Sequence, residues 1–302
     1  MKRLLFLGIM ALVVSCNEGS NTDDQHSMFD LQGHRGARGL FPENSIQGFV
    51  KAFEMGVTTL EMDLAVSMDG QLVVTHDPFI LPTLCTWPNG DFLDSIQPFF
   101  YNIYQMDYQD VSLFDCGSLP LINFPNQLKE PSIKPLLSEV LDRIEWMSSQ
   151  QHQLINYNIE LKSSVVTDNI FHPAPNIFAD LVYQLIDQKT DWQRVTIQSF
   201  DFRVLQYFHS AYPQVKLALL IENELPWESN IDSLGFLPQV YSCEFILLDS
   251  VVIGQLKAAD MQVIPWTVND TLEMKQLMRW GVDGLITDYP NIAIDLLKRK
   301  ND

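Results

Sequence analysis

Acidic side chains alternate with apolar ones in two segments whose composition is typical of β-strands. "LEMDL" places Glu61 and Asp63 two residues apart, and "NIELK" places Glu160 midway between Asn158 and Lys162. Side chains two residues apart lie on the same face of a strand, so each segment presents its polar groups together. If the strands are neighbours, the three carboxylates can hold one divalent cation, Ca2+ or Mg2+, with Mn2+ also compatible. The alternative is a set of ion pairs inside the protein, for instance Glu160 with Lys162.

Two histidines and an arginine add groups that can transfer protons and bind an anion. His34 and His76 both fall where a predicted strand ends, and Arg35 follows His34 directly. Two imidazoles can divide the roles of general acid and general base near neutral pH. A guanidinium can bind a phosphate through two hydrogen bonds, and Lys162 adds a point charge. Together with the carboxylates, these residues indicate phosphoryl transfer.

Strand-like and helix-like segments alternate along the chain from about residue 30. Apolar residues at helical spacing predict helices at 46–56, 137–144, 178–185 and 272–280, the first ended by Gly56 and the last capped by Asp270 or Thr271. Predicted strands cover 29–33, 58–66, 154–162, 194–200, 216–221, 244–248, 262–268 and 283–288. This alternation favours an α/β fold, a (β/α)8 barrel of the TIM type, over an open doubly wound sheet. Barrel enzymes place their sites at the carboxyl ends of the strands, where His34 and His76 fall.

The region after the second strand departs from this alternation. Residues 70–76 follow that strand too closely to form another parallel strand, so we expect a hairpin across the "SMDG" turn. Residues 77–135 have little periodicity and many Pro, Asn, Phe and Tyr residues, which predicts an inserted segment at about 79–135, called the insertion below.

The N-terminus has the features of a targeting segment. Lys2 and Arg3 precede an apolar run at 4–14, and "VVSC", which ends at Cys16, resembles the lipobox of bacterial lipoproteins. This resemblance implies a signal peptide at 1–15, acylation of Cys16 and a polar tether at 16–28. The protein is then expected outside the cytoplasm in a bacterial cell envelope, bound to a membrane by its lipid anchor.

Composition and cysteine content restrict the remaining possibilities. The chain has 302 residues, a net charge of -19 and 46% hydrophobic residues, which suffices for a large core. Nucleic acid is an unfavourable partner because its phosphates require clustered Lys and Arg, and no segment after the first twenty residues has the length and apolarity of a membrane span. We expect Cys85, Cys116 and Cys243 to be buried apolar side chains, with a Cys85–Cys116 disulfide as the alternative in an oxidising compartment. Nothing in the sequence specifies the oligomeric state.

Seven short motifs resemble those of the glycerophosphodiester phosphodiesterase family, in family order. They are "GHRG" (33–36), "PENS" (42–45), "LEMDLAVSMDGQLVVTHD" (60–77), "IELK" (159–162), "IQSFD" (197–201), "PWTVN" (265–269) and "GVDGLITDYP" (281–290). The resemblance implies a TIM-type barrel at 29–302 with the insertion after the second strand. The segment that follows His76 departs from the family pattern, which leaves the alcohol specificity open.

The resemblance also implies a role for each candidate residue. It makes His34 and His76 the general acid and base, and Arg35, Lys162 and Trp266 the substrate-binding residues. Trp266 would form an apolar wall of the glycerol pocket, with barrel packing as the alternative. Glu61, Asp63 and Glu160 would hold the metal, with Glu43 beside the cluster and Asn44 fixing the loop and starting the helix.

The expected reaction is metal-dependent hydrolysis of a small-molecule glycerophosphodiester to glycerol 3-phosphate and an alcohol. One alternative is an enzyme like a lysophospholipase D or a phosphoinositide phospholipase C. Another is a noncatalytic lipoprotein that binds a ligand, which predicts gaps among the candidate residues.

Overall fold

A computed structural model describes residues 29–94 and 98–300 of the chain. The predicted signal peptide, tether and acylated Cys16 lie outside the described residues. Among the described residues, no helix combines the length and the apolarity required to cross a bilayer.

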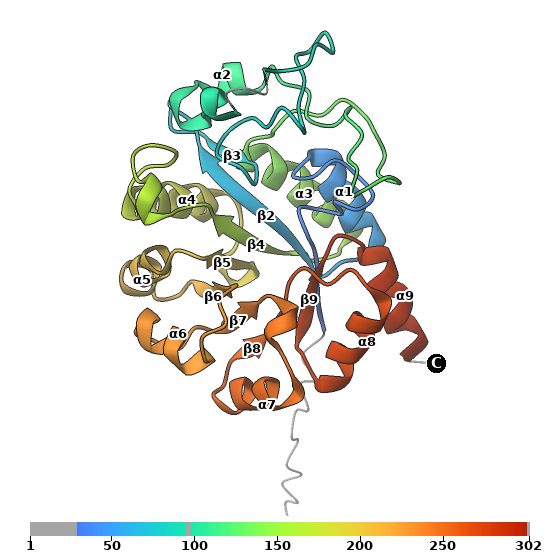
Figure 1. Ribbon diagram of the computed structural model, residues 1–302, viewed down its shortest axis with the longest axis vertical. Helices are drawn as coiled ribbons and strands as arrows, with labels where there is room; N and C mark the ends of the chain where they lie inside the picture. Colours follow the sequence, from blue (N-terminus) through green and yellow to red (C-terminus); the bar gives the residue numbers. More distant parts are fainter. Residues whose placement is uncertain (1–28, 95–97, 301–302) are drawn as a thin grey trace, which may run out of the picture.

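Eight parallel strands form a central barrel with helices packed around it (Figure 1). The strands are β1 (Asp30–Gly33), β2 (Thr59–Val66), β4 (Asn156–Leu161), β5 (Val195–Ser199), β6 (Lys216–Ile221), β7 (Val240–Cys243), β8 (Gln262–Val263) and β9 (Gly284–Thr287). Their order in the sheet is β8-β7-β6-β5-β4-β2-β1-β9. Backbone hydrogen bonds from Asp283 N to Val263 O (2.9 Å) and from Ile286 N to Pro265 O (3.0 Å) bring the two ends of this sheet together. The predicted TIM-type barrel is confirmed.

Eight helices cover the outside of the barrel, and the main hydrophobic core lies between the two layers. They are α1 (Ile46–Met55), α3 (Leu137–Gln151), α4 (Pro175–Lys189), α5 (Phe202–Ala211), α6 (Trp227–Leu234), α7 (Ser250–Ala258), α8 (Thr271–Trp280) and α9 (Pro290–Lys300). The predicted helix ends are confirmed at Gly56, which has a φ of 96°, and at Asp270, whose side chain caps α8. Gly56 can adopt this left-handed conformation because it has no Cβ.

The strand predicted at 244–248 is wrong. β7 ends at Cys243, and Phe245–Leu247 form a single turn of 3-10 helix instead. The strand in the structure, "VYSC", was not predicted because Ser242 interrupts its apolar pattern. Ser242 is nevertheless buried, and its hydroxyl donates a hydrogen bond to Ile264 O (2.7 Å). The strand predicted at 262–268 is also shorter, because β8 covers only Gln262–Val263.

The region after β2 begins with a hairpin. β3 (Leu72–Val74) pairs antiparallel with β2, so the predicted hairpin is confirmed. Between β3 and α3 the described chain is mostly irregular, with two short 3-10 helices and α2 (Tyr108–Val111). It packs around a small hydrophobic core that also includes Ala65 of β2 and Val73 of β3. It lies at the edge of the barrel beside β2 and β3 (Figure 1).

The cysteine pairing corrects the expectation that all three cysteines are apolar fillers. Cys85 and Cys116 form a disulfide within the insertion, whereas Cys243 is free and buried in β7. Both bonded cysteines belong to the small core of the insertion, so they are buried as well as bonded.

Candidate active site

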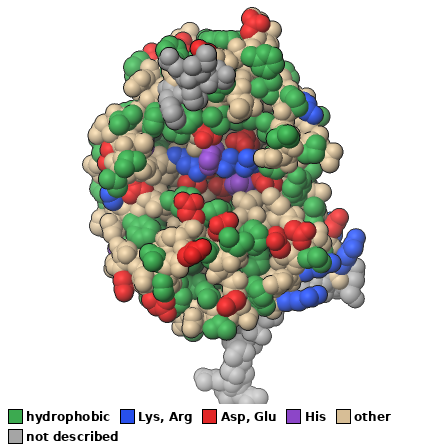
Figure 2. Space-filling model, viewed as in Figure 1, with side chains coloured by type: hydrophobic (Ala, Val, Ile, Leu, Met, Phe, Trp, Pro, Cys, Tyr) green, Lys and Arg blue, Asp and Glu red, His purple; other side chains and the backbone are tan. Residues whose placement is uncertain are grey.

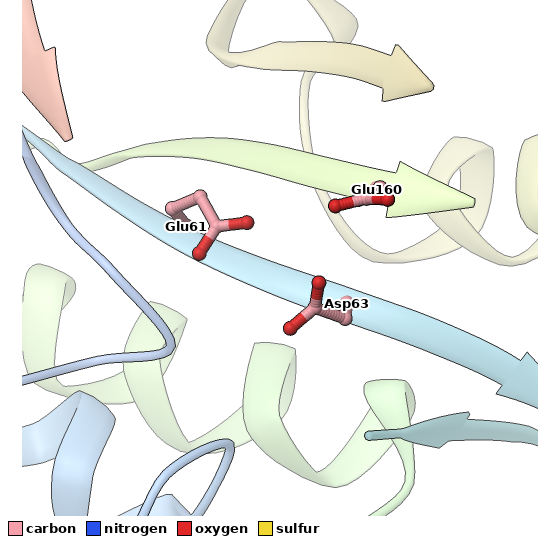
Figure 3. Close-up of side chains that lie close together, drawn as sticks. All are labelled: Glu61, Asp63 and Glu160. Atoms are coloured by element: carbon pink, nitrogen blue, oxygen red, sulfur yellow. The ribbon is translucent and has the colours of Figure 1, made fainter. Parts of the chain in front are cut away.

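Three carboxylates converge on the inner side of the barrel. Glu61 and Asp63 extend from β2 and Glu160 extends from the adjacent β4, and Figure 3 shows the three groups turned toward one another. Each residue offers an oxygen that lies within 4.8 Å of the other two, and all three residues are buried. The predicted convergence is therefore confirmed in geometry.

Strand register explains why these side chains meet. β2 and β4 are parallel, and Asp63 lies directly opposite Glu160 in the ladder. The intervening Leu60, Met62 and Leu64 point to the other face and are fully buried under the helices. The alternation seen in the sequence therefore separates a polar interior from an apolar exterior.

Two cationic side chains contact the carboxylates. Lys162 Nζ lies 2.7 Å from Glu160 Oε1 and 3.1 Å from Asp63 Oδ1, and Arg35 Nε lies 3.2 Å from Asp63 Oδ2. The backbone N–H of Arg35 also donates to Glu61 Oε2 at 2.9 Å. The ion pair between Glu160 and Lys162 that the sequence offered as an alternative is thus present, but it forms part of the same acidic cluster.

The cluster retains unfavourable negative charge despite these cations. Burial and the neighbouring Asp63 carboxylate raise the pKa of Glu61 well above its ordinary value. Burial also raises the pKa of Glu160, although Lys162 opposes the shift. A bound cation would relieve this repulsion, and the donors are hard oxygen atoms, so the residues present fit a divalent metal ion.

Asp288 holds the imidazole of His34, and Asn269 in turn holds Asp288. His34 Nδ1 lies 2.7 Å from Asp288 Oδ1, and Asn269 Nδ2 donates to Asp288 Oδ2 at 2.7 Å. Burial lowers the pKa of His34, although Asp288 opposes the shift. With Nδ1–H donated to Asp288, Nε2 of a neutral imidazole is free to accept a proton.

His34 and His76 line the same cavity, called the inner cavity below, which has a volume of about 230 Å3. The inner cavity is also lined by Arg35, Lys162 and Trp266, among others. Figure 2 shows Lys, Arg, His and acidic side chains gathered in a central hollow on an otherwise mixed surface. A second hollow of about 620 Å3, called the outer groove, adjoins the inner cavity, and Arg35, Arg38 and His76 line both.

Glu43 and Asn44 hold side chains of the site in position. Glu43 pairs with Arg35 Nη1 at 3.2 Å and with Arg38 Nε at 2.9 Å. Burial would raise the pKa of Glu43, but Arg35 and other cations hold it at about 2. Asn44 Nδ2 donates to Asp63 Oδ2 at 2.9 Å, so it orients a carboxylate of the cluster. The prediction that Asn44 starts the helix is corrected, because the N-cap of α1 is Ser45.

Trp266 both faces the inner cavity and packs against the barrel. It lines the inner cavity, where its ring stands edge-on to Phe200 with centroids 5.5 Å apart. Its Nε1–H also donates to Ser242 O at 2.9 Å, which fixes the ring against the barrel.

Residues 34–292 match the model of the Glycerophosphoryl diester phosphodiesterase family. The chain belongs to this family. The prediction of a phosphoric diester hydrolase is thereby confirmed, and the acidic cluster is compatible with metal binding.

Similar proteins match nearly the whole chain. A glycerophosphodiester phosphodiesterase of Caldanaerobacter subterraneus is 28% identical over 88% of this chain and 96% of its own length. A crystal structure from Silicibacter pomeroyi has a TM-score of 0.77 and 26% identity, covering 89% of this chain and 94% of that one. An Oleispira antarctica phosphodiesterase, solved with the product sn-glycerol-3-phosphate, has a TM-score of 0.71 and 20% identity over 89% of this chain and 96% of that one.

Several polar residues of this phosphodiesterase site escaped the sequence prediction. Asp288 and Asn269 hold His34, and Gln198 Nε2 donates to Glu61 Oε1 at 2.8 Å. All three lie in motifs that the sequence analysis singled out. Asp288 directly follows β9, Gln198 is the last residue but one of β5, and Asn269 directly follows the strand predicted at 262–268, so closeness to a strand end was the available signal. Lys134 is different, because it lies in the irregular insertion, where no period or motif indicated that it is only 3% exposed. Burial lowers the pKa of Lys134, while Glu43 and Asp77 oppose the shift.

Proposed function

We propose that this phosphodiesterase hydrolyses glycerophosphodiesters to sn-glycerol 3-phosphate and an alcohol, with one divalent cation bound. The observation that carries the proposal is that one cavity is lined by, among others, an arginine, two histidines and two carboxylates, and that these two carboxylates form a buried cluster with Asp63. The product bound to the Oleispira antarctica relative supports the identity of the phosphate-bearing product. A noncatalytic barrel would lack part of this set, and the described site has every candidate group.

The metal would be held by Glu61, Asp63 and Glu160. Their oxygen donors and their burial favour Ca2+ or Mg2+, with Mn2+ as the alternative. When bound, the cation supplies positive charge that stabilises the phosphate oxygens as negative charge builds up on them. Arg35 and Lys162 would add fixed cationic hydrogen-bond donors on the same oxygens.

The two histidines would divide the proton transfers. Of the two hollows, His34 lines the inner cavity, and it donates Nδ1–H to Asp288, so its Nε2 would accept the proton of the glycerol 2-hydroxyl. The oxygen of that hydroxyl then attacks phosphorus as an intramolecular nucleophile and forms a cyclic phosphate that bridges positions 2 and 3 of the glycerol. His76 lies where the inner cavity meets the outer groove, and it would protonate the leaving alcohol there. Water opens the cyclic phosphate with the two roles reversed.

The glycerol moiety would occupy the inner cavity beside Trp266. The indole ring gives the carbon skeleton an apolar wall, while the polar groups of the cavity are available to its hydroxyl groups.

We also propose that the enzyme is a lipoprotein of the bacterial envelope, anchored through Cys16. The lipobox-like "VVSC" sequence supports this location. Cys16→Ala should leave the protein without acyl chains and release it from membranes, whereas its activity in detergent should persist. Wild-type protein without acyl chains by mass spectrometry would contradict the anchor.

A substrate that lacks the 2-hydroxyl tests the reaction most directly. The protein lacking residues 1–16 is assayed with glycerophosphoethanolamine and with its 2-deoxy analogue, each with and without a chelator. We expect turnover only with the intact substrate and the metal. Equal hydrolysis of both substrates would indicate direct attack by water and would contradict the role assigned to His34.

A further inference from the structure

The outer groove is larger than the inner cavity and has a different lining. It measures about 620 Å3, against about 230 Å3 for the inner cavity. The insertion contributes Leu81 and Leu84 from its first part and Leu121, Ile122 and Phe124 from its later part. Ile122 is 93% exposed, so a large aliphatic side chain stands on this groove without an apolar neighbour to cover it.

The charged groups of the outer groove are mostly paired with one another. Glu43 contacts both Arg35 and Arg38, so its negative charge is balanced within the protein. Asp77 contacts His76, with Oδ2 lying 3.3 Å from Nδ1. Beyond the charged residues, the lining of the groove consists of aliphatic and aromatic side chains together with two uncharged polar residues, Thr83 and Asn123.

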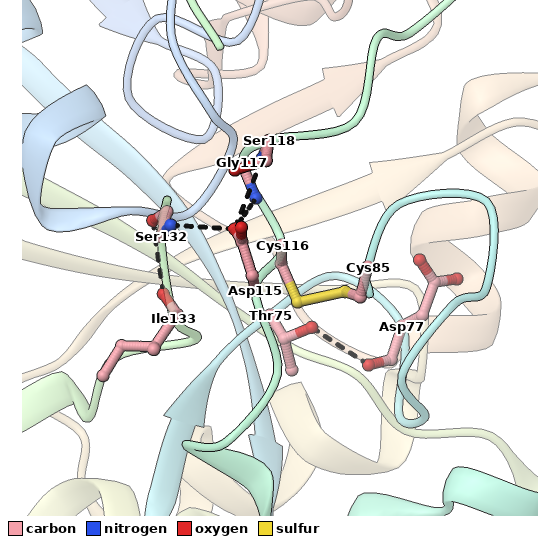
Figure 4. The surroundings of a disulfide bond; sticks show 9 residues. All are labelled: Thr75, Asp77, Cys85, Asp115, Cys116, Gly117, Ser118, Ser132 and Ile133. Atoms are coloured by element: carbon pink, nitrogen blue, oxygen red, sulfur yellow. Dashed lines mark hydrogen bonds between the residues drawn. A yellow bond between two sulfur atoms is a disulfide. The ribbon is translucent and has the colours of Figure 1, made fainter. Parts of the chain in front are cut away.

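Several bonds fix the walls of the outer groove in place. The Cys85–Cys116 disulfide joins the two parts of the insertion, and Asp115 Oδ1 accepts hydrogen bonds from the backbone N–H groups of Gly117, Ser118 and Ser132 (Figure 4). These contacts hold the segments on both sides of the wall that Leu121 and Ile122 form.

The same wall is also attached to the barrel. Gln127 Nε2 donates to Arg38 O at 2.6 Å and to Phe41 O at 3.0 Å, and the Arg38 guanidinium lies 4.7 Å from the centre of the Phe124 ring. Contacts of this kind make the groove a preformed site rather than a gap in a loose loop.

The connection between the two hollows indicates what the groove binds. A phosphodiester carries two alcohols on one phosphorus atom, and the phosphate would lie at Arg35 and His76, which line both hollows. If the glycerol fills the inner cavity, as the proposed function requires, the second alcohol must extend into the outer groove. His76 then lies beside the oxygen of that alcohol.

We propose that the outer groove is the leaving-group site and that it selects alcohols with an alkyl or acyl chain, such as a monoacylglycerol. The bond from phosphorus to the alcohol oxygen breaks, that oxygen takes a proton from His76, and the oxygen of the glycerol 2-hydroxyl forms the new bond to phosphorus. The chain of the departing alcohol lies along Leu81, Leu84, Leu121 and Ile122. This inference rests on the proposed function for the chemistry, but the binding of the chain can be measured separately.

Binding and turnover of a graded series of esters test this proposal. Glycerol phosphodiesters of ethanol, butanol and octanol are assayed below their micellar concentrations with Ca2+ and Mg2+ present. Their 2-deoxy analogues, which cannot form the cyclic phosphate, are titrated by calorimetry. We expect the octyl analogue to bind on the order of 50-fold more tightly than the ethyl analogue, at about twofold for each methylene in a groove open on one side. The kcat/KM values of the reactive esters should rise in the same order.

A variant pair distinguishes the groove from unspecific attraction of alkyl chains. Leu121→Ser combined with Ile122→Ser should reduce the octyl-to-ethyl ratio in both measurements to a few-fold. Leu113→Ser is the matched control, because Leu113 is an exposed leucine of the insertion that does not line the groove, and it should keep the full ratio.

Each remaining outcome decides one of the two proposals. Turnover of the ethyl ester with no dependence on chain length, or a dependence that survives in the double variant, would overturn the leaving-group site and leave the proposed function standing. Chain-dependent binding without turnover of any ester would support the groove and contradict the proposed function.

Discussion

The inner cavity and the outer groove meet at His76, but they are built in different ways. The cavity takes its carboxylates from the neighbouring strands β2 and β4, and its histidines and cationic side chains from the short segments that follow strands, so the barrel positions these groups. The groove is formed largely by irregular chain, which a disulfide, a carboxylate and a few side-chain amides hold in place.

Because of this difference, the two regions should respond differently to substitutions. Charges in the inner cavity are buried and mutually dependent, so the removal of one leaves another without its partner. Apolar side chains on the outer groove are partly exposed and contact few charged groups, so their substitution should change selectivity more than chemistry. The predictions below test this contrast, beginning with the largest expected effect.

Removal of one carboxylate from the cluster should have the largest effect. Glu61→Gln should lower turnover on the order of 10³-fold, because a metal ion would lose one of its three carboxylates and the phosphate charge would be less well balanced. Turnover assays at saturating Ca2+ or Mg2+ measure this loss.

Stability of the metal-free protein provides an independent readout for the same variant. The pKa of Glu61 is raised, so the metal-free fold loses stability as pH rises through the range in which Glu61 ionises. Glu61→Gln should therefore melt at an equal or higher temperature than the wild type above this range, whereas added metal should raise only the wild-type midpoint strongly. A variant that keeps normal turnover, or that gains as much stability from the metal, would refute the metal site.

Asp288→Asn should reduce activity less severely. The amide cannot hold the imidazole of His34 in the required tautomer, so kcat/KM should fall on the order of 10²-fold. Asp288 also raises the pKa of His34, so its removal should move the acidic limb of the pH profile to lower pH. That limb is measured from kcat/KM against pH.

An exposed acid elsewhere provides the control for this substitution. Asp187→Asn on α4 removes one negative charge from the surface and should leave both the rate and the profile unchanged. If Asp288→Asn lowers the rate without any shift of the acidic limb, Asp288 orients His34 but does not tune its ionisation.

The same contrast explains which features the sequence could predict. The alternation in "LEMDL" and "NIELK" has a period of two, so it specified both the strand and the face on which Glu61, Asp63 and Glu160 lie. Asp288 was not predicted because its side chain contacts His34, 254 positions away in the sequence, and such a pairing leaves no local pattern.

Residues of the insertion were harder to predict for a different reason. No period identifies a buried lysine such as Lys134 in an irregular segment, and the pairing of Cys85 with Cys116 depends on how that segment folds back. The strand predicted at "EFILL" (244–248) was wrong because apolar content alone does not distinguish a strand from a short helical turn that packs against the core.

Removal of the disulfide should affect stability rather than chemistry. The bond joins residues 31 positions apart, so Cys85→Ser with Cys116→Ser should lower the free energy of unfolding by about 2–4 kcal/mol. Urea titration of the variant, and of wild-type protein under reducing conditions, should give the same loss. The barrel should still hydrolyse a small glycerophosphodiester, because the bonded cysteines belong to the separate core of the insertion. A complete loss of that activity would mean that the barrel site depends on the insertion.

The smallest effect is expected at Asp115, which fixes the later part of the insertion. Its burial would raise its pKa, but hydrogen bonds from Ser118, Gly117 and Ser132 outweigh this and lower it. A carboxyl group with a lowered pKa stabilises the fold at neutral pH, and this contribution is lost as pH falls through the folded-state pKa. Asp115→Asn should cost about 1 kcal/mol at pH 7, because the bonds to a charged acceptor are partly exposed to water.

The cost of Asp115→Asn should disappear in acid, where the wild-type carboxyl group is itself protonated. Urea titrations at pH 7 and near pH 3 measure this difference, with Asp110→Asn as the control, since Asp110 is an exposed acid of α2 in the same insertion. A cost that is equal at both pH values would show that the shape of the side chain, and not its charge, holds the backbone there. The ratio of octyl to ethyl ester turnover at pH 7 should fall in Asp115→Asn and stay unchanged in Asp110→Asn, because Asp115, unlike Asp110, accepts hydrogen bonds from the segments beside the wall that carries Leu121 and Ile122.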